Sequence, residues 1–391
     1  MKIFNKNEWK KVKLGDVCEV ITGNTPLKKI EEYWDKDEVP FITPPELKYE
    51  GINYITPNIY VSKIGAKQGR IIPKNSICVC CIGSLGKLGI LKEDAITNQQ
   101  INSLILKDKN VDLLYLYFYL KTIKNNLESI ASSTTVKIIN KSSFEKIEIS
   151  LPNLEIQKKI SKKLELLENN IKLRKSQLVF LKELTKSLFT TMFGDILNNS
   201  LNWRQVKLED LCSSIVRGPF GSSLKKEFFV KNGYKVYEQK NAINQSADLG
   251  EYYINEEKFK ELKRFECKTK DIIMSCSGTV GKLFQLPEGS KKGVINQALC
   301  KFSLNNKTVS IYFLKCLEKI MENLKLNGSG IKNISSVSYL RKIDISLPPI
   351  ELQNKFAERI EKIEKLKFEI EKSIEMAQNL YNSLISKYFD N

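Results

Sequence analysis

The sequence predicts an α+β protein: two mixed α/β domains related by a pseudo-twofold axis and separated by two long antiparallel α-helices that pair like a coiled coil. The first observation behind this prediction is a duplication, because KIEISLPNLEIQKK at 146–159 returns as KIDISLPPIELQNK at 342–355, with nine of fourteen positions identical. The second is that each copy precedes about forty residues with helical periodicity and no glycine or proline. The third is a set of landmarks that recur in the same order before each copy. The chain is therefore a tandem duplication.

The duplicated segment marks where each domain ends and each helix begins. In the first copy Ile147, Ile149 and Leu151 alternate as in a short strand, which Pro152 stops. The expected boundaries are a first domain at 1–152, a first helix at 153–195, a second domain at 196–348 and a second helix at 349–391.

Both domains are expected to be mainly β. Candidate strands of the first domain lie at 40–42, 54–60 and 77–82, and the aromatic segment 113–121 is expected to be helical, with its aromatic rings in the core rather than stacked on bases. The segments between the shared landmarks diverge. Two related domains that recognise different targets are expected to share a framework and to differ in the segments between the landmarks.

The landmarks recur at nearly constant offsets. A Trp-x-x-Val-Lys-Leu-x-Asp opening, a loop ending in Gly-Lys and an Asn-Gln pair return after 194, 195 and 198 residues. A Tyr-Phe pair at 117–118 is matched with the pair at 312–313, after 195 residues.

Each helical segment carries an apolar stripe, which requires a partner helix. Forty helical residues make a rod of roughly 60 Å, which cannot bury such a stripe alone. If the halves are related by a pseudo-twofold axis, the two helices run antiparallel with one domain at each end; the alternative is that each helix folds back on its own domain. The stripe residues are Ile160, Leu164, Leu167, Ile171, Leu178, Leu181, Leu184 and Leu188 in the first helix, and Phe356, Ile360, Ile363, Leu366, Ile370, Ile374, Ala377, Leu380 and Leu384 in the second.

The composition indicates a polyanionic partner. The chain has 391 residues, 42% of them hydrophobic, and a net charge of +18. The two helical segments carry only +5 of this charge, so +13 lies on the rest of the chain. The alternative is a solvated lysine surface without a nucleic-acid partner, and the concentration of charge outside the helices argues against it.

The absence of histidine narrows the possible chemistry. It removes Ser-His and Cys-His nucleophile pairs and His-ligated metals, although catalysis through carboxylates or lysine stays open. Nine irregularly spaced cysteines without histidine argue against a zinc site and are typical of reduced, buried thiols. No signal peptide or membrane span is expected, so the predicted location is cytoplasmic.

Two loops that end in Gly-Lys, at 83–87 and 278–282, raise the question of nucleotide binding. A P-loop needs a glycine five residues before the Gly-Lys and Ser or Thr directly after it. Cys81 and Cys276 occupy the earlier position and leucines follow, so nucleotide hydrolysis is rejected. What remains is contact with DNA phosphate or, equally, a purely structural turn.

Other polar residues suit DNA contacts. The pairs Asn98-Gln99 and Asn296-Gln297 have side chains that can bond adenine edges, although bracing a turn is the favoured interpretation. Lysines after turns can reach phosphates. The candidates for DNA contact are Thr25, Lys28, Lys29, Ser84, Lys87, Asn98, Gln99, Ser222, Ser223, Lys225, Lys226, Thr279, Lys282, Asn296 and Gln297.

The segment Thr43-Pro-Pro-Glu46 resembles the Asn/Asp-Pro-Pro-Tyr/Phe signature of amino-methyltransferases only superficially. That chemistry needs an acceptor for the target amino group and an aromatic ring that stacks on the flipped base. Thr43 and Glu46 supply neither role, and no glycine-rich cofactor motif accompanies them. The chain is not expected to be a methyltransferase.

Over essentially its whole length the chain resembles the specificity (S) subunits of type I restriction-modification enzymes. The resemblance rests on the ordered, duplicated set of landmarks rather than on any one of them. These are Gly23-Asn-Thr-Pro26, Gly218-Pro-Phe-Gly-Ser-Ser-Leu224, both Gly-Lys loops, both Asn-Gln pairs, both Ile-Ser-Leu-Pro junctions with their Glu-x-Gln, and Met192-Phe-Gly-Asp195. The two opening loops are different variants, so they need not contact DNA alike.

The resemblance implies a non-catalytic subunit in which two target recognition domains each read half of a split DNA sequence. It implies that the helices set the gap and dock partner subunits. The implied partners are double-stranded DNA, two methyltransferase subunits that methylate adenine, and two restriction or translocase subunits, without a membrane. No cofactor is expected in this chain, and S-adenosylmethionine, ATP and Mg are expected in the partners.

Two other classes of function stay open. A nuclease or methyltransferase acting alone would show activity without partners. A helical scaffold with an incidental basic surface would show no sequence preference on DNA.

Overall fold

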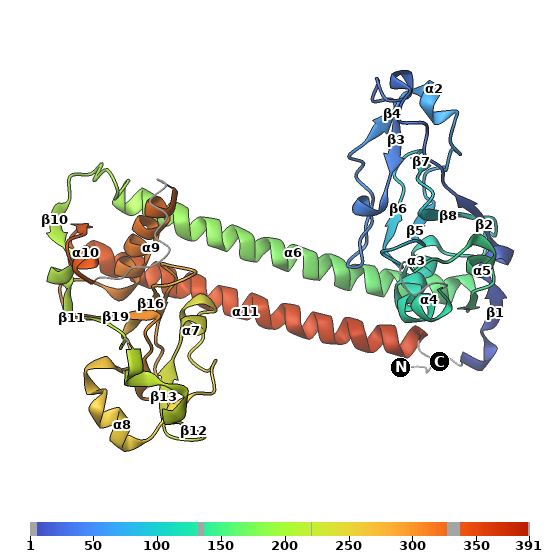
Figure 1. Cartoon of the computed structure of the whole chain (residues 1–391). Helices are drawn as coiled ribbons and strands as arrows, with labels where there is room; N and C mark the ends of the chain where they lie inside the picture. Colours follow the sequence, from blue (N-terminus) through green and yellow to red (C-terminus); the bar gives the residue numbers. More distant parts are fainter. Residues whose placement is uncertain (1–5, 132–136, 220, 327–336, 390–391) are drawn as a thin grey trace. The chain divides into compact units, whose positions relative to one another are not determined.

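The computed structural model describes residues 6–131, 137–219, 221–326 and 337–389, and it divides into two compact units (Figure 1). The first unit is the chain up to Leu178 together with the segment from Glu369 onward. The second unit is Val179–Phe368. Each of the two long helices, α6 (Leu154–Phe193) and α11 (Ile350–Phe389), therefore contributes one part to each unit.

The two largest sheets of the first unit have four and three strands. One has the antiparallel order β2 (Cys18–Thr22), β8 (Ile101–Leu106), β5 (Ile77–Cys80) and β6 (Leu88–Ile90). The other has the order β4 (Tyr60–Val61), β3 (Val39–Ile42) and β7 (Ile96–Thr97), with β3 and β7 parallel. The expected strand at 54–60 is wrong, because only its last residue belongs to a strand and Pro57 cannot donate to a ladder.

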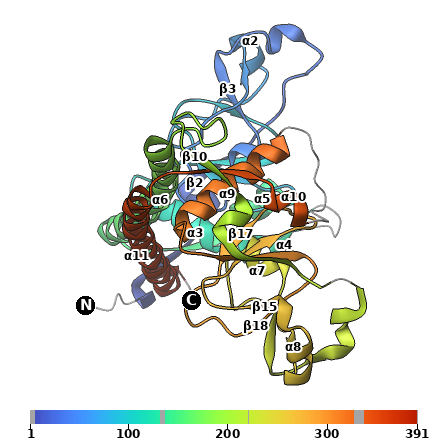
Figure 2. The ribbon, with the colours of Figure 1, turned by 90° about the vertical axis from the view of Figure 1, so that its left-hand side faces the viewer.

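The second unit repeats both sheets and enlarges one. Its four-stranded sheet has the order β11 (Cys212–Arg217), β19 (Leu299–Leu304), β16 (Ile272–Ser275) and β17 (Leu283–Gln285). Its five-stranded sheet has the order β12 (Phe229–Val230), β14 (Tyr253–Ile254), β13 (Tyr234–Tyr237), β18 (Gly293–Ile295) and β15 (Glu266–Cys267), with β13 and β18 parallel. Helix α8 (Glu256–Glu261) lies beside β15 and β18 (Figure 2).

Shorter helices complete the units. In the first unit these are α1 (Leu14–Val17), α2 (Lys63–Ala66), α3 (Leu113–Thr122), α4 (Lys124–Ile130) and α5 (Lys141–Glu145). In the second they are α7 (Gln239–Ile243), α9 (Ser310–Leu326) and α10 (Val337–Arg341). Among the described residues, no helix combines the length and the apolar character that crossing a bilayer would require.

The duplicated segment forms the same junction in both units. Strand β9 (Glu148–Leu151) pairs with β1 (Lys10–Lys13), and β20 (Asp344–Leu347) pairs with β10 (Arg204–Lys207) in the same antiparallel register. The glutamine of each Glu-x-Gln is buried and bonded to its own domain. Gln157 donates to the carbonyls of Asn110 and Pro152 and accepts from the amide of Asp112.

Gln353 is bonded to the corresponding segments of the second unit. It donates to the carbonyl of Pro348 and accepts from the amide of Val309 and the hydroxyl of Thr308. Because these glutamines lie in the first turn of α6 and α11, they fix the start of each long helix to the sheet domain before it.

The aromatic match expected at an offset of 195 residues is wrong. The hydroxyl of Tyr115 donates to the carbonyl of Ser150, and that of Tyr312 donates to the carbonyl of Ser346, so Tyr115 and Tyr312 are equivalent at an offset of 197. Adjacent aromatic residues such as Tyr117 and Phe118 gave a false alignment by residue type alone. As expected, the aromatic side chains of this segment are buried.

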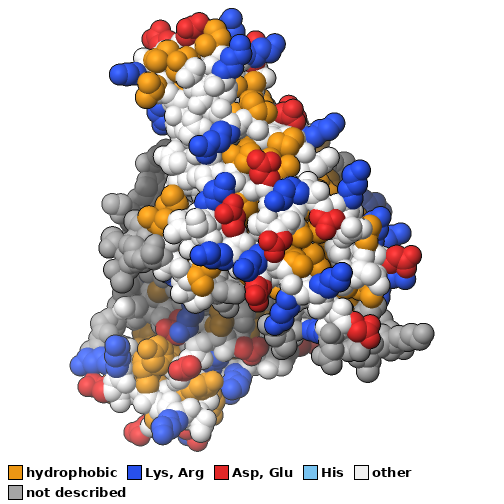
Figure 3. Space-filling model, turned by 90° about the vertical axis from the view of Figure 1, so that its right-hand side faces the viewer, with side chains coloured by type: hydrophobic (Ala, Val, Ile, Leu, Met, Phe, Trp, Pro, Cys, Tyr) orange, Lys and Arg blue, Asp and Glu red, His pale blue; other side chains and the backbone are white. Residues whose placement is uncertain are grey.

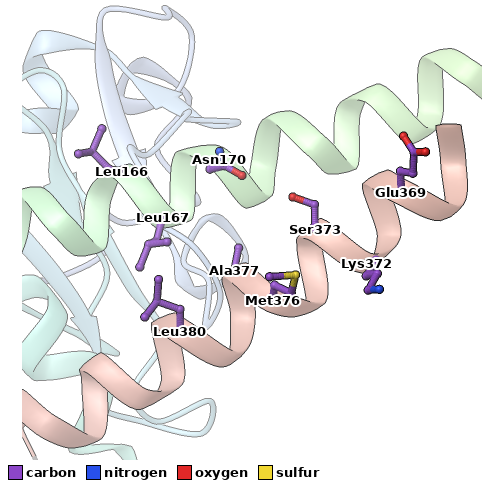
Figure 4. Close-up of a pocket in the computed structure, with 9 residues that line it drawn as sticks. All are labelled: Leu166, Leu167, Asn170, Glu369, Lys372, Ser373, Met376, Ala377 and Leu380. Carbon is purple, nitrogen blue, oxygen red and sulfur yellow. The ribbon is translucent and has the colours of Figure 1, made fainter.

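Segments of α6 and α11 pack against each other within each unit. In the first unit, residue numbers rise along α6 and fall along α11 in the same direction, so the helices are antiparallel (Figure 4). In the second unit Phe189 and Phe193 of α6 contact Phe356 of α11, with ring centroids 5.6 and 5.2 Å apart.

Most of the expected stripe is buried or half-buried, but three positions are not. Leu184, Leu366 and Leu380 are 50%, 45% and 51% exposed. The apolar face of a straight helix drifts relative to a seven-residue repeat, and the buried positions here are one residue later, at Thr185 and Tyr381. The stripe residues that are buried or half-buried are Ile160, Leu164, Leu167, Ile171, Leu178, Leu181, Leu188, Phe356, Ile360, Ile363, Ile370, Ile374, Ala377 and Leu384.

A buried ion pair distinguishes the first unit from the second. Lys121 of α3 pairs with Glu168 of α6, and its ammonium lies 3.3 Å from the hydroxyl of Tyr381 of α11. At the offsets of the repeat, the second unit has Glu318 and Thr185 in place of Lys121 and Tyr381. The parts of α6 and α11 in the two units therefore carry different residues at the positions that contact the neighbouring domain.

Candidate nucleic-acid interface

In both units a glycine brings the opening loop, which follows the first strand of the four-stranded sheet, against the Asn-Gln turn. A Cβ atom on Gly23 would lie 2.1 Å from the carbonyl oxygen of Thr97, and one on Gly218 would lie 1.9 Å from the carbonyl oxygen of Asn296. The amides of these glycines donate to the carbonyls of Ile101 and Leu299. Two segments about 75 residues apart in the sequence are thus joined at a single point in each unit.

In the first unit, this contact opens into a pocket of about 440 Å³. The hydroxyl of Thr25, in the opening loop, donates to the side-chain oxygen of Gln99, in the turn between β7 and β8, at 2.7 Å. The structure therefore brings together four of the predicted DNA-contacting residues. The lining residues are Thr25, Pro26, Leu27, Lys28, Phe41, Thr43, Asn98, Gln99 and Gln100.

The two members of each Asn-Gln pair have different surroundings. Asn98 is buried, donates to the side chain of Gln100 and accepts from the Gln100 amide, and Asn296 accepts from the Ala298 amide. Both asparagines brace their turns. Gln99 and Gln297 are exposed. The glutamines are therefore the more exposed members of the two pairs.

The Gly-Lys loops are hairpin turns that join β5 to β6 and β16 to β17. Their second glycines, Gly86 and Gly281, have φ of 76° and 75° and donate to the carbonyls of Cys80 and Ser275. Leu85 and Val280 point into the core. The amides of Gly86 and Gly281 are therefore engaged within the protein rather than available to a phosphate.

The side chains of these loops differ in exposure. Lys282 and Thr279 are exposed, whereas Ser84 is half-buried. Lys87 is also half-buried, and its ammonium lies 5.7 Å from the ring centroid of Tyr49. Lys282 is therefore freer than Lys87 to reach a phosphate.

The remaining predicted lysines lie at the surface of the opening loops. Lys28 and Lys29 are exposed, as are Lys225 and Lys226. Lys225 pairs with Glu227 at 3.6 Å. Ser223 is half-buried, and the side chain of Ser222 lies outside the described residues.

Sequence reasoning missed several residues beside these loops. The ammonium of Lys124 lies 4.3 Å from the ring centroid of Tyr49, so two lysines flank one exposed aromatic ring. Burial raises the pKa of Tyr49 above its ordinary value, with the nearby Cys80 and Glu128 adding to the shift. In the second unit Gln239 donates to the carbonyl of Ser277 in the Gly-Lys loop. These residues share no sequence motif, so no pattern could have found them.

Thr43 and Glu46 form a local cap. The carboxylate of Glu46 accepts from the amide and hydroxyl of Thr43, at 2.9 and 2.7 Å, and from the side chain of Asn58 at 3.0 Å. These bonds begin the short helical turn Pro44–Glu46. The Thr-Pro-Pro-Glu sequence therefore has a structural role as the cap of this turn.

An apolar groove lies between α6 and α11 in the first unit (Figure 4). Its volume is about 730 Å³. Leu166 of α6 and Met376 and Leu380 of α11 line it and are 60%, 65% and 51% exposed. Asn170, Glu369, Lys372 and Ser373 also line it. Exposed apolar side chains at this density are typical of interaction surfaces.

Basic side chains are not gathered into one patch on the face drawn in Figure 3. Among the described residues of that face, lysines and arginines are interspersed with acidic and hydrophobic side chains (Figure 3). On this face the basic side chains are therefore distributed rather than clustered.

Two repeats of one sheet domain, each followed by a long helix, define a duplicated protein with one loop cluster per repeat. The profile described as the type I restriction modification DNA specificity domain matches residues 6–183 and again residues 200–377. The chain belongs to this family of specificity subunits, which are generally non-catalytic.

Individual relatives agree with this assignment. The chain is 27% identical to the type I restriction enzyme MjaIX specificity subunit of Methanocaldococcus jannaschii over 97% of its own length and 92% of the relative. It is 36% identical to the HindI specificity subunit of Haemophilus influenzae over 39% of its length and 34% of the relative.

Solved structures share the fold. A type I restriction-modification S subunit from M. genitalium matches with a TM-score of 0.62 and 16% identity, covering 100% of this chain and 98% of that one. A chain from a structure of the assembly and conformational transition of a type I restriction-modification system matches with a TM-score of 0.62 and 17% identity, covering 97% of both chains.

Proposed function

We propose that this chain is the DNA-reading subunit of a type I restriction-modification complex, in which each unit reads one half of a bipartite DNA sequence. The observation that carries the proposal is the cluster formed in both units by the opening loop and the Asn-Gln turn, on a duplicated frame whose loops diverge. Membership of the specificity family supplies the class of ligand.

The distribution of charge supports this assignment. The +13 outside the long helices provides sequence-independent attraction to phosphates, and exposed lysines such as Lys28, Lys226 and Lys282 flank or belong to the loops. Exposed amides such as Gln99 and Gln297 supply hydrogen-bonding groups for base edges.

The long helices have two roles in this proposal. Each is continuous over 40 residues, so their length would fix the gap between the two half-sites. The groove around Leu166 and Met376 would dock the apolar face of a helix from a methyltransferase subunit. We place S-adenosylmethionine in two methyltransferase subunits, and ATP and Mg in two restriction subunits, rather than in this chain.

The docking role is tested by Leu166→Glu and Met376→Glu, which change exposed side chains and should leave the fold intact. We expect each variant to lose co-purification of the methyltransferase subunit while its circular dichroism spectrum stays unchanged. Ile71→Glu changes another exposed apolar residue, in the first domain, and is the control. Undiminished co-purification of both variants would contradict docking at the groove.

The DNA-reading role is tested by selection from a random DNA pool with the purified complex of this chain and its methyltransferase partner. We expect two short conserved blocks separated by a fixed number of unconserved bases. A selection without any conserved sequence would support a scaffold, and methylation or cleavage by the chain alone would support a stand-alone enzyme.

A further inference from the structure

The first unit holds one of its exposed base-facing candidates in a defined orientation. Gln99 accepts the hydroxyl hydrogen of Thr25 at its side-chain oxygen, at 2.7 Å. A hydroxyl has only one hydrogen to donate, and it is directed at the oxygen rather than at the amide nitrogen. The oxygen of Gln99 is therefore held toward Thr25, and its two N–H groups, which form no hydrogen bond within the described part of the chain, remain available as donors.

The residues next to Gln99 have different roles: some hold the turn in place, and others are exposed to a ligand. Asn98, next in the chain, is 8% exposed, and both ends of its side-chain amide are bonded to Gln100. Its side chain is therefore engaged in holding the turn. Leu27 is 57% exposed and lines the same pocket, and Lys28 beside it is exposed. The pocket thus combines an oriented donor, an apolar contact and a cation.

In the second repeat the sequence has no hydroxyl at the position that corresponds to Thr25. The loop Gly23-Asn-Thr25 corresponds to Gly218-Pro-Phe220, so a phenylalanine occupies the position of Thr25. Gln297 is exposed, and within the described part of the chain its side chain forms no hydrogen bond. The two glutamines are equivalent in the repeat, and among the described residues Gln99 is the one whose side chain accepts from a threonine hydroxyl.

We infer that Gln99, oriented by Thr25, is a specificity-determining residue that donates hydrogen bonds to a base offering acceptors in the major groove; this inference rests on the proposed function. The bases that fit are guanine, through N7 and O6, and thymine, through O4 with its methyl group against Leu27. Cytosine offers a donor at this edge and is disfavoured. Thr25 is a positioning residue, because it acts through Gln99.

The test uses the intact complex in its host and reads the methylated motif by genome-wide methylation sequencing. Gln99→Glu replaces a donor by an acceptor while keeping a partner for the Thr25 hydroxyl. We expect one base of one half-site to change from guanine or thymine toward cytosine or adenine, with discrimination altered about 5- to 100-fold. Thr25→Val frees the amide, so we expect the same base to become less strictly required.

Two further variants keep the result interpretable. Gln297→Glu should affect only the other half-site, and Lys28→Ala should lower methylation without changing the motif. If Gln99→Glu abolishes methylation, Gln99→Ala decides: a relaxed requirement at one base supports the inference.

An unchanged motif in Gln99→Ala or Gln99→Glu, or changes in both half-sites, would overturn the inference and leave the proposed function standing. A wild-type complex that methylates no bipartite motif would remove the proposed function and this inference with it.

Discussion

At the scale of single residues, Gly23 and Gly218 show why the loop clusters form where they do. Any side chain at either position would overlap a carbonyl oxygen of the facing turn, at about 2 Å. The glycine therefore lets two backbones touch, and the residues that follow it are delivered to the Asn-Gln turn. Both glycines lie in motifs that are visible in the sequence. Their close approach to the facing turn could not be predicted, because that turn is distant in the chain and only the fold brings it near.

Lys282 gives a prediction about DNA binding. Its ammonium is exposed on the second Gly-Lys loop, so Lys282→Ala should weaken binding by the assembled complex and reduce the slope of log affinity against log salt by about 1. Lys87→Ala should have a smaller effect, since Lys87 is half-buried near Tyr49. Titrations at several salt concentrations measure both slopes.

Lys270→Ala is the matched control, because Lys270 is also exposed but pairs with Glu288 at 3.3 Å on another loop. An unchanged slope for Lys282→Ala would remove that residue from the interface.

The cysteines give a prediction about pH. Burial raises the pKa of Cys78 and Cys81 to about 12, and burial also raises the pKa of Cys316 to about 12. These thiols therefore stay neutral in the folded protein well above about pH 8.5, where unfolded thiols ionise. The raised values stabilise the folded state below that pH and less so above it, so the free energy of unfolding should fall as pH rises past 9.

Alkylation with iodoacetamide checks this directly. The native protein should react slowly at pH 8, and the protein in denaturant should react at all nine cysteines. Rapid reaction of several cysteines in the native state would contradict the burial of these thiols.

At the scale of elements, the junction between each domain and its long helix depends on one glutamine. Gln157→Ala would remove three hydrogen bonds and leave buried carbonyl and amide groups without partners. We expect a loss of about 3 kcal/mol in the free energy of unfolding, measured with urea, and a similar loss for Gln353→Ala.

Gln177→Ala, at an exposed position of the same helix, should change stability by less than about 0.5 kcal/mol. Equal effects at Gln157 and Gln177 would mean that the junction glutamine is not a structural anchor.

The elements also show what a sequence pattern can and cannot predict. The run without glycine or proline predicted two long helices, and within the described residues α6 spans Leu154–Phe193 and α11 spans Ile350–Phe389. The face of each helix that packs against its partner was harder to predict, because Leu184, Leu366 and Leu380 are apolar and were assigned to the stripe although they are exposed. Thr185 and Tyr381 are buried instead, because the helical repeat, rather than the residue type, determines which side of the helix faces its neighbour.

At the scale of the whole molecule, duplication made the architecture predictable. Two copies of one junction, one opening segment and one pair of loops are enough to define two similar domains from the amino-acid sequence alone. It was less predictable which member of the Asn-Gln pair is exposed, because Asn98 and Gln99 look alike in sequence. In the structure Asn98 is buried and holds its turn, whereas Gln99 is exposed.

The central claim is that this chain gives a methyltransferase complex its bipartite DNA target. The most direct measurement is genome-wide methylation sequencing of the host with and without the gene for this chain. The account predicts that deletion removes methylation at one motif made of two blocks separated by a fixed gap, and that reintroducing the gene restores it. An unchanged set of methylated motifs after deletion would contradict the account.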